Sequence, residues 1–196
     1  MYKFFILSIG ILLQACTSPA QKINYYLLHT VSVDTVKKVN PQSPRIILSK
    51  IQLADYLRPD SLVLQLGEHE LFYSPKDIWA ETLQTAISKA LLFDLNQQSN
   101  DYQYINHTSA NQGSASYELI LQIDHFLATD KSQVVAAGKY WLLNRETGEQ
   151  ILFEPFYLQQ VLNKDGYPHA VEQLRTLVLA LSHEISRGID SLQRQT

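Results

Sequence analysis

The chain has 196 residues, which suits one domain with a short appendage. It is 45% hydrophobic and 18% charged, so it holds enough apolar material for one core and too few charges for a disordered protein. A net charge of −3 leaves no basic surplus for phosphates and argues against a nucleic-acid partner. The single cysteine excludes disulfides within the chain and cysteine-based zinc sites.

Residues 1–15 are typical of an export signal. Lys3 forms a short charged region, and an apolar run follows from Phe4 to Leu13. A permanent membrane-spanning helix needs about 20 apolar residues, so this run is too short for one, and no later stretch approaches that length. The sequence therefore predicts a cleaved signal and no transmembrane helix in the mature chain.

Leu13-Gln14-Ala15-Cys16 ends the apolar run and resembles the lipobox of bacterial lipoproteins. The resemblance implies that the signal is removed, that Cys16 is acylated, that 16–24 is a lipidated tether and that 25–196 is a single periplasmic domain. Several acyl chains hold a protein stably on a membrane. Thr17 favours the periplasmic face of the outer membrane by analogy, because an aspartate there would resemble an inner-membrane retention signal. The alternative is an ordinary secretory signal with an incidental cysteine.

Strand formers dominate the first part of the domain. Asn24 to Leu28 is the first predicted strand, and Arg45 to Leu53 is the second, with its apolar residues at a period of two. Leu62 to Leu66 alternates in the same way. Gly67 to His69 then turns the chain into Glu70 to Tyr73, which predicts a hairpin.

Ser74 and Pro75 predict the start of a helix, because serine caps helices and proline suits the first helical turn. Trp79 begins an apolar stripe that recurs every three or four residues to about Leu95. A short strand is predicted from Tyr102 to Asn106.

The second half predicts three long strands and a helix. Apolar residues alternate from Tyr117 to Leu127, and further strands are predicted over Val134 to Asn144 and Ile151 to Leu158. Pro155 lacks a backbone donor, which places the last strand at an edge or a bulge. The apolar residues from Pro168 to Leu192 form the seam of a long helix. This order of elements predicts an α+β fold, with a mostly antiparallel β-sheet and two amphipathic helices packed on one face.

The sequence carries no recognised catalytic motif. It contains no nucleophile elbow, no H-E-x-x-H helix and no phosphate-binding glycine loop, so we predict no enzyme, no catalytic residue, no cofactor and no metal. Glu68-His69-Glu70 is interpreted as a solvated hairpin tip, because neighbouring strand residues point to opposite faces. His125 is interpreted as a hydrogen-bonded, partly buried histidine.

The aromatic residues are more informative, with eleven tyrosines, seven phenylalanines and two tryptophans. Tyrosine is favoured at interfaces because it joins a large apolar body to a polar tip. Tyr140 and Trp141 are neighbours in a predicted strand, so they point to opposite sides of the sheet. One of them must face away from the helices, where the sheet is bare or meets another subunit.

Several short motifs follow the lipobox in order along the chain. They are Tyr25-Tyr26-Leu27-Leu28, Asp55-Tyr56-Leu57, Trp79 early in a helix, Gly138-Lys139-Tyr140-Trp141-Leu142-Leu143-Asn144, Phe156-Tyr157-Leu158 and Asp165-Gly166-Tyr167. In this order they resemble the ABC-type transport auxiliary lipoprotein family, over essentially the whole mature chain. The resemblance implies a role without catalysis.

Members of that family are outer-membrane lipoproteins that dock MCE-domain proteins of ABC transport systems, which carry lipids across the periplasm. For this chain the resemblance implies Cys16 as the lipidated residue and an MCE-domain protein as the partner. Tyr56, Trp141 and Tyr167 are candidate partner-binding or structural residues, and a closed homo-oligomer would suit a collar around a tunnel. The alternatives are another envelope assembly lipoprotein, acting in lipopolysaccharide export or as a cell-wall synthase cofactor, and a lipid-anchored hydrolase.

Overall fold

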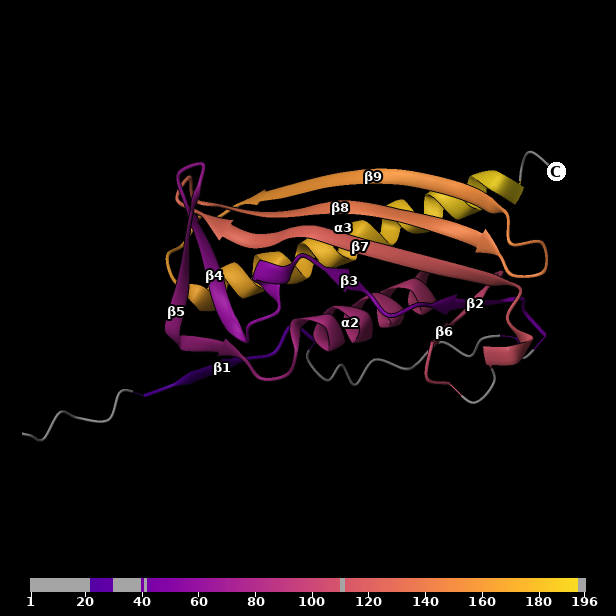
Figure 1. Cartoon of the computed structure of the whole chain (residues 1–196), viewed down its shortest axis with the longest axis horizontal. Coiled ribbons are helices and arrows are strands. Elements are labelled where there is room, and N and C mark those ends of the chain that lie inside the picture. The colour runs from indigo at the N-terminus through magenta and orange to yellow at the C-terminus, as the bar shows by residue number, and fades with distance from the viewer. Residues whose placement is uncertain (1–21, 30–39, 41, 110–111, 194–196) are drawn as a thin grey trace, which may run out of the picture.

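The computed structural model describes residues 22–29, 40, 42–109 and 112–193. These form an α+β fold in which one mixed sheet packs against two helices, as Figure 1 shows. The strands are β1 (Asn24–Tyr26), β2 (Arg45–Leu48), β3 (Gln52–Leu53), β4 (Ser61–Leu66), β5 (Glu70–Trp79), β6 (Gln103–Asn106), β7 (Tyr117–Thr129), β8 (Gln133–Asn144) and β9 (Gln150–Val161). The helices are α2 (Leu83–Gln98) and α3 (Tyr167–Gln193), with the short 3₁₀ helices η1 (Asp55–Leu57) and η2 (Gln112–Ser114). The predicted signal and Cys16 lie outside the described residues.

Strand β7 is the centre of the sheet. On one side it pairs along its length with β8, and β8 pairs with β9, both in antiparallel ladders. On its other side β7 pairs in turn with β2, β3 and β4, all parallel. Beyond these, β6 pairs with β2, β5 with β4, and β1 with β5. The long ladders are antiparallel as predicted, and the short parallel ladders make the sheet mixed.

The strand predicted over Arg45–Leu53 is in fact two strands, β2 and β3. Leu48 pairs with Leu119, and Gln52 pairs with Gln122. The chain between these two pairs is therefore longer than the facing stretch of β7, and the ladder is interrupted. Both strands still lie along the same edge of β7, so the prediction failed only in continuity.

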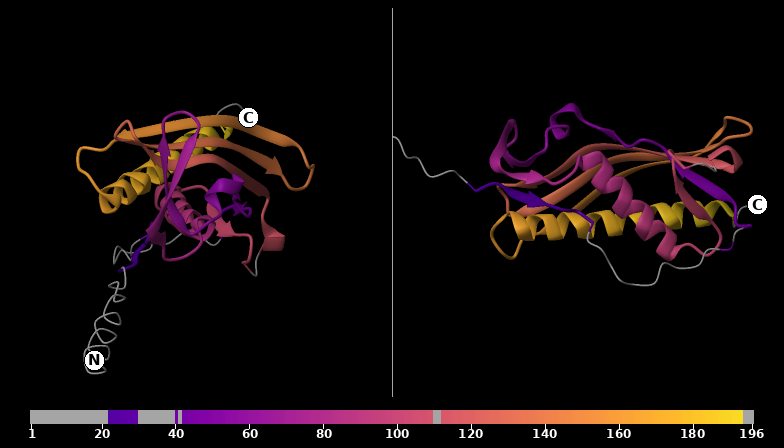
Figure 2. Two further views of the ribbon diagram at one scale, coloured as in Figure 1. Left: turned by 60° about the vertical axis from the view of Figure 1, so that its left-hand side comes forward. Right: turned by 90° about the horizontal axis from the view of Figure 1, so that it is seen from below.

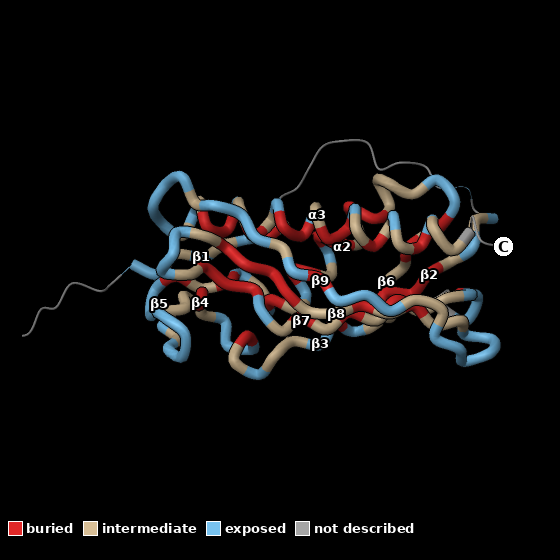
Figure 3. Tube along the Cα trace, turned by 90° about the horizontal axis from the view of Figure 1, so that it is seen from above, coloured by how far each residue is buried: buried red, intermediate tan, exposed pale blue. Residues whose placement is uncertain are grey.

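Both helices cover one side of the sheet, which confirms the predicted architecture. Helix α3 packs along β7, β8 and β9, and α2 packs against α3 and β6 (Figure 2). The seam of α3 is buried at Val171, Leu174, Val178, Leu181 and Ile185. Figure 3 shows buried residues on the inner sides of the helices, whereas β9 is largely exposed. At Gly188 an added Cβ would lie 3.1 Å from the Tyr140 hydroxyl, so this glycine lets α3 approach the sheet closely.

The helix start predicted at Ser74 is wrong. Strand β5 continues to Trp79, and α2 begins at Leu83 with Thr82 as its cap. The Ser74 hydroxyl accepts a hydrogen bond from the Asp77 amide at 3.1 Å, which is the bond that a helix cap makes. The chain nevertheless stays extended, because Asp77, Ile78 and Trp79 pair with β1. Pairing with a distant strand therefore outweighs the local helix signal.

Asp77 joins β1 to the sheet through a buried group of hydrogen bonds. Its carboxylate accepts hydrogen bonds from Asn24 Nδ2 at 2.9 Å, Tyr26 Oη at 3.0 Å and Ser74 Oγ at 2.7 Å. Burial favours the neutral acid, but the three donors outweigh it, and the pKa of Asp77 is lowered. Burial of the ring, followed by its hydrogen bond to Asp77 and the Asp77 charge, raises the pKa of Tyr26 to about 12.

We expect Asp77→Asn to lower the free energy of unfolding by about 2 kcal/mol at neutral pH, because a charged acceptor of several hydrogen bonds is lost. The lowered pKa means that the carboxylate stabilises the fold above its ordinary pKa and that this contribution is lost as the pH falls through the lowered value. Urea denaturation should therefore show the variant and the parent converging between about pH 5 and pH 2. The exposed Asp165→Asn is the control, and a constant gap across this range would contradict the prediction.

A bulge in β7 changes the face to which its side chains point. The pairing moves from Ile123 opposite Gly138 to His125 opposite Ala137, so Asp124 is the extra residue. At Gly138 an added Cβ would lie 2.0 Å from the backbone oxygen of Gln122, so only glycine fits there.

Gly138→Ala should consequently lower the free energy of unfolding by about 2 kcal/mol, because the backbone must move to admit the methyl group. Gly113→Ala is the matched control, since a Cβ there meets nothing within 4 Å. Thermal unfolding followed by circular dichroism measures both. Equal stabilities of the two variants would show that the bulge tolerates a side chain.

Candidate interaction surface

The side of β7–β9 that faces away from the helices carries aromatic and aliphatic residues among polar ones, and we name it the open face. Figure 1 views the sheet from this side, with α3 behind it. Cross-strand partners share a face, so the pairing of the three strands identifies its members. Its apolar and aromatic members and its histidine are Ile120, His125, Leu127, Val135, Ala137, Trp141, Leu143, Phe153, Tyr157 and Val161. The same pairing places Glu118, Gln122, Thr129, Gln133, Lys139, Gln150, Pro155 and Gln159 on this side.

The pair Tyr140 and Trp141 shows why the two sides of the sheet differ. Tyr140 is buried under α3, and its hydroxyl donates to the backbone oxygen of Glu184 at 3.4 Å. Burial, followed by the charges of Glu154 and Glu184, raises the pKa of Tyr140 to about 12. Trp141 points the other way and lies half-buried between its cross-strand partners on the open face. Trp141 is therefore the member of the pair on the uncovered side.

The outer part of the open face exposes large apolar side chains. Phe153 is 51% exposed and Tyr157 66% exposed, and both lie on β9. Within the described part of the chain β9 pairs only with β8, so it is an edge strand, as Pro155 predicted. Contiguous exposed apolar side chains mark interaction surfaces.

The inner part of the open face has a buried floor. Leu127, Val135 and Ala137 are buried although no helix covers them. Beside them lies a groove of about 300 Å³ between the β4–β5 hairpin and β9, lined among others by Leu127, Val135, Gln65 and Tyr157. Most of the other side chains that line the groove are polar or charged, so it offers a partner hydrogen-bonding groups around a small apolar patch.

Tyr56 borders the open face beside β7, at the bulge. It lies in η1, and its hydroxyl donates to the backbone oxygen of Asp124 at 2.7 Å and lies 2.9 Å from His125 Nδ1. The Tyr73 hydroxyl in turn donates to the Tyr56 carbonyl at 3.2 Å. Burial, followed by the Asp124 charge, raises the pKa of Tyr56 to about 12, so its hydroxyl remains a donor at neutral pH. Tyr56 is thus held in place by the bulge of β7.

His125 is hydrogen-bonded, as predicted, but it is exposed rather than partly buried. The strict alternation assumed along β7 would have placed it under the helices with Leu121 and Ile123. The extra residue Asp124 reverses the alternation and turns His125 to the open face.

Tyr167 does not join Tyr56 and Trp141. It is the first residue of α3, directly after Gly166, whose φ of 102° forms the turn predicted there. Its side chain is half-buried and packs against the core beside Trp79 and Phe126. The structure therefore brings two of the three predicted residues to one face and places the third at the opposite side of the sheet.

The acidic cluster Glu68-His69-Glu70 forms the tip of the β4–β5 hairpin, as interpreted. His69 Nε2 and Glu68 Oε2 are 3.9 Å apart and both side chains are exposed. Among the residues that the structure describes, no three His, Cys, Asp or Glu side chains come together as metal ligands would. Neither described helix is long and apolar enough to cross a bilayer.

Sequence patterns missed the buried floor of the open face and the position of Phe153. One sequence feature indicated the bulge that turns Leu127 to the open face. Gly138 is an isolated glycine inside a strand, which is typical of a bulge or a close backbone approach. No local pattern indicated which side of β9 remains uncovered, because both of its sides carry apolar residues.

Comparisons with known proteins agree with this fold. Among solved structures, an uncharacterized protein superposes with a TM-score of 0.71 at 20% identity, over 86% of this chain and 99% of its own. Protein XCC0632 from Xanthomonas campestris superposes with a TM-score of 0.68 at 12% identity, over 88% of this chain and 98% of its own. These likenesses show the fold alone, and no curated protein matches the chain. The model of the family described as ABC-type transport auxiliary lipoprotein component matches residues 26–186, and the chain therefore belongs to that family.

Proposed function

We propose that this protein is an outer-membrane lipoprotein, anchored by Cys16, that docks a periplasm-spanning MCE-domain protein of an ABC lipid transport system. Membership of a transport auxiliary family supports the coarse role, and the lipobox supports the anchor. In this proposal the protein binds and positions its partner and catalyses nothing.

The observation that carries the docking role is the open face. Phe153 and Tyr157 are exposed, and Trp141 is half-buried opposite Phe153 on the neighbouring strand. Aromatic side chains of this kind are enriched in the cores of protein interfaces. Tyr56 borders this surface at the bulge of β7, and the groove beside Leu127 offers a recess. A soluble domain gains nothing in stability from large apolar side chains in water, so a partner explains them better than the fold does.

We further propose that several copies assemble into a ring around the partner. A collar around a tunnel must close, and cyclic symmetry closes with one repeated contact. Native mass spectrometry of the detergent-solubilised lipoprotein should give one oligomer larger than a dimer. A monomer at all concentrations tested would contradict the ring.

The docking role is tested by affinity capture from solubilised envelopes. The unaltered lipoprotein should recover an MCE-domain protein, and the combined variant Trp141→Ala, Phe153→Ala and Tyr157→Ala should recover at least ten-fold less. Leu179→Ala, which removes an exposed apolar side chain from α3, is the control and should bind normally. If the unaltered lipoprotein recovers no MCE-domain protein, the docking role is contradicted.

The anchor is tested separately with Cys16→Ser. Without the thiol, acylation and signal removal should stop while the domain still folds, because residues 26–186 make up the family domain. Mass spectrometry reads the acylation, and flotation of outer-membrane vesicles after a high-salt wash reads the location. A variant that still floats with these vesicles after signal removal would show that Cys16 is not the anchor.

A further inference from the structure

The outer side of β1 is an apolar stripe. Ile23 is 47% exposed, Tyr25 65% and Leu27 54%. The alternate residues point inward: Asn24 and Tyr26 bind Asp77, and Leu28 belongs to the core. The period of two places Ile23, Tyr25 and Leu27 on one side, which we name the β1 stripe.

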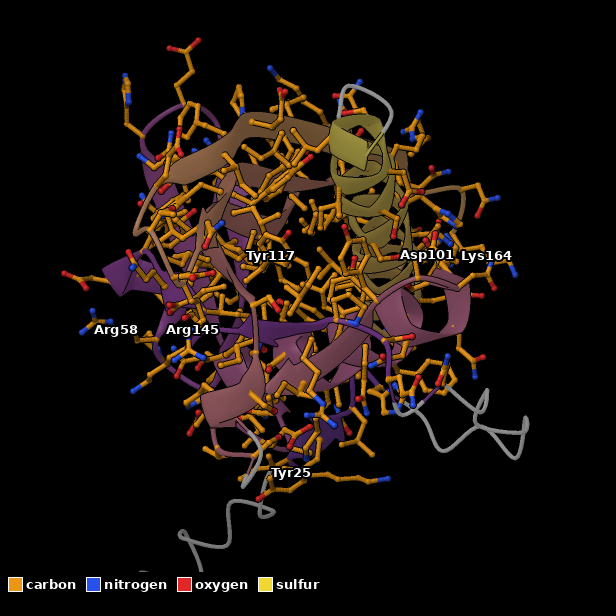
Figure 4. The ribbon with its side chains drawn as sticks, turned by 90° about the vertical axis from the view of Figure 1, so that its right-hand side faces the viewer. Tyr25, Arg58, Asp101, Tyr117, Arg145 and Lys164 are labelled. Carbon is orange, nitrogen blue, oxygen red and sulfur yellow. The ribbon has the colours of Figure 1, made fainter. Side chains whose placement is uncertain are left out.

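Residues next to the β1 stripe continue it onto the neighbouring strand β5. Tyr25 pairs with Ile78 of β5, so Ile78 lies on the same side and is only half-buried. Lys22 and Lys76 are exposed beside the stripe. Within the described residues β1 pairs with β5 alone, so no further strand covers it. Figure 4 places Tyr25 at the lower periphery of the molecule, away from α3.

The position of the stripe relative to Cys16 limits what it can meet. Ile23 is seven positions after Cys16, a length of chain that spans at most about 25 Å when fully extended. β1 lies at the opposite end of the molecule from the C-terminal end of α3 (Figure 1). If acyl chains on Cys16 enter a bilayer, the β1 stripe is held within reach of its surface.

We propose that the β1 stripe inserts into the lipid headgroup boundary of the same leaflet and forms a second membrane contact beside the acyl chains. The proposal rests on the proposed acylation of Cys16. Tyrosine is enriched at this boundary because its ring enters the apolar layer while its hydroxyl stays hydrated. Lys22 and Lys76 add attraction to anionic lipids. The two contacts together fix the orientation of the domain, which a single flexible tether does not.

Site-directed fluorescence in the full acylated protein tests the contact. Because acylation occupies the native thiol, Tyr25→Cys introduces one free cysteine for the environment-sensitive dye NBD. Tyr157→Cys is the matched control, since Tyr157 is 66% exposed against 65% for Tyr25. Both proteins are placed in vesicles of phosphatidylethanolamine and phosphatidylglycerol that carry spin-labelled lipid.

We expect the dye at position 25 to shift to the blue and to be quenched at least two-fold by the spin-labelled lipid, while the dye at position 157 behaves as in water. If the dye at position 25 fluoresces as in water, in protein whose acylation is verified by mass, the membrane contact of the β1 stripe is contradicted and the anchor is not. Shielding of position 25 only by an added protein partner contradicts this membrane contact as well. If the protein is found to be unacylated and does not float with vesicles, both the proposed anchor and the proposed membrane contact of the β1 stripe are contradicted.

Discussion

Replacing Trp79 with alanine is expected to lower the free energy of unfolding by about 4 kcal/mol, because a buried indole is removed from the core. Trp79 is 5% exposed, and its ring lies 6.5 Å from that of Phe126 at an angle of 40°. It ends β5 just before α2, so the cavity would open where the sheet meets the helices. Urea denaturation should give the loss of free energy directly. Thermal unfolding should show a fall in melting temperature of about 10 °C.

The other tryptophan is the control for this prediction. Trp141 is half-buried on the open face, so Trp141→Ala should change the free energy of unfolding by less than about 1 kcal/mol. The contrast separates a residue of the core from a residue available to a partner. Similar losses for both variants would mean that the open face is covered within the folded chain.

Removing Arg175 is expected to lower the free energy of unfolding by about 3 kcal/mol. Its guanidinium donates to both carboxylate oxygens of Asp94 at 2.7 and 2.6 Å and so ties α3 to α2. The side chain of Asp94 is 4% exposed, so Arg175→Ala leaves a buried carboxylate without its counter-ion. The Arg175 side chain is 27% exposed, and water reaching the vacated space keeps the loss at the lower end of the usual range.

The double variant Asp94→Leu with Arg175→Met shows whether the loss comes from the unpaired charge. Replacing both partners by apolar side chains of similar volume removes the desolvation penalty, so most of the stability should return. Urea denaturation of the parent, of Asp94→Leu and Arg175→Met singly and of the double variant completes the cycle. A double variant less stable than Arg175→Ala would assign the loss to packing between the helices.

Long periodic patterns predicted the fold well. β7 and α3 were located because each repeats its apolar period over many residues, and β8 and β9 were located as long runs of strand formers with apolar residues on both sides. The β4–β5 hairpin was located because Gly67 supplies the positive φ of its turn, here 68°. These elements are set by interactions between near neighbours in the chain.

Short segments were predicted less well, because their structure depends on distant partners. Ser74 makes the hydrogen bond of a helix cap, yet β1 pairs with the residues that follow and keeps them extended. The single strand predicted over Arg45–Leu53 is broken because it must match the spacing of β7. In both places the partner strand, far away in sequence, decides the conformation.

The candidate anchor and the fold class are determined by the sequence itself, since the lipobox at Cys16 and the periodic strands are local patterns. The tertiary structure alone decides which aromatic residues share a surface. Tyr56 and Trp141, 85 positions apart in the chain, lie on one face because the bulge at Asp124 turns β7 and because α3 covers only the other side. The physical reason is that burial is a property of the whole packed sheet: a strand with two apolar sides does not specify which side the helices will cover.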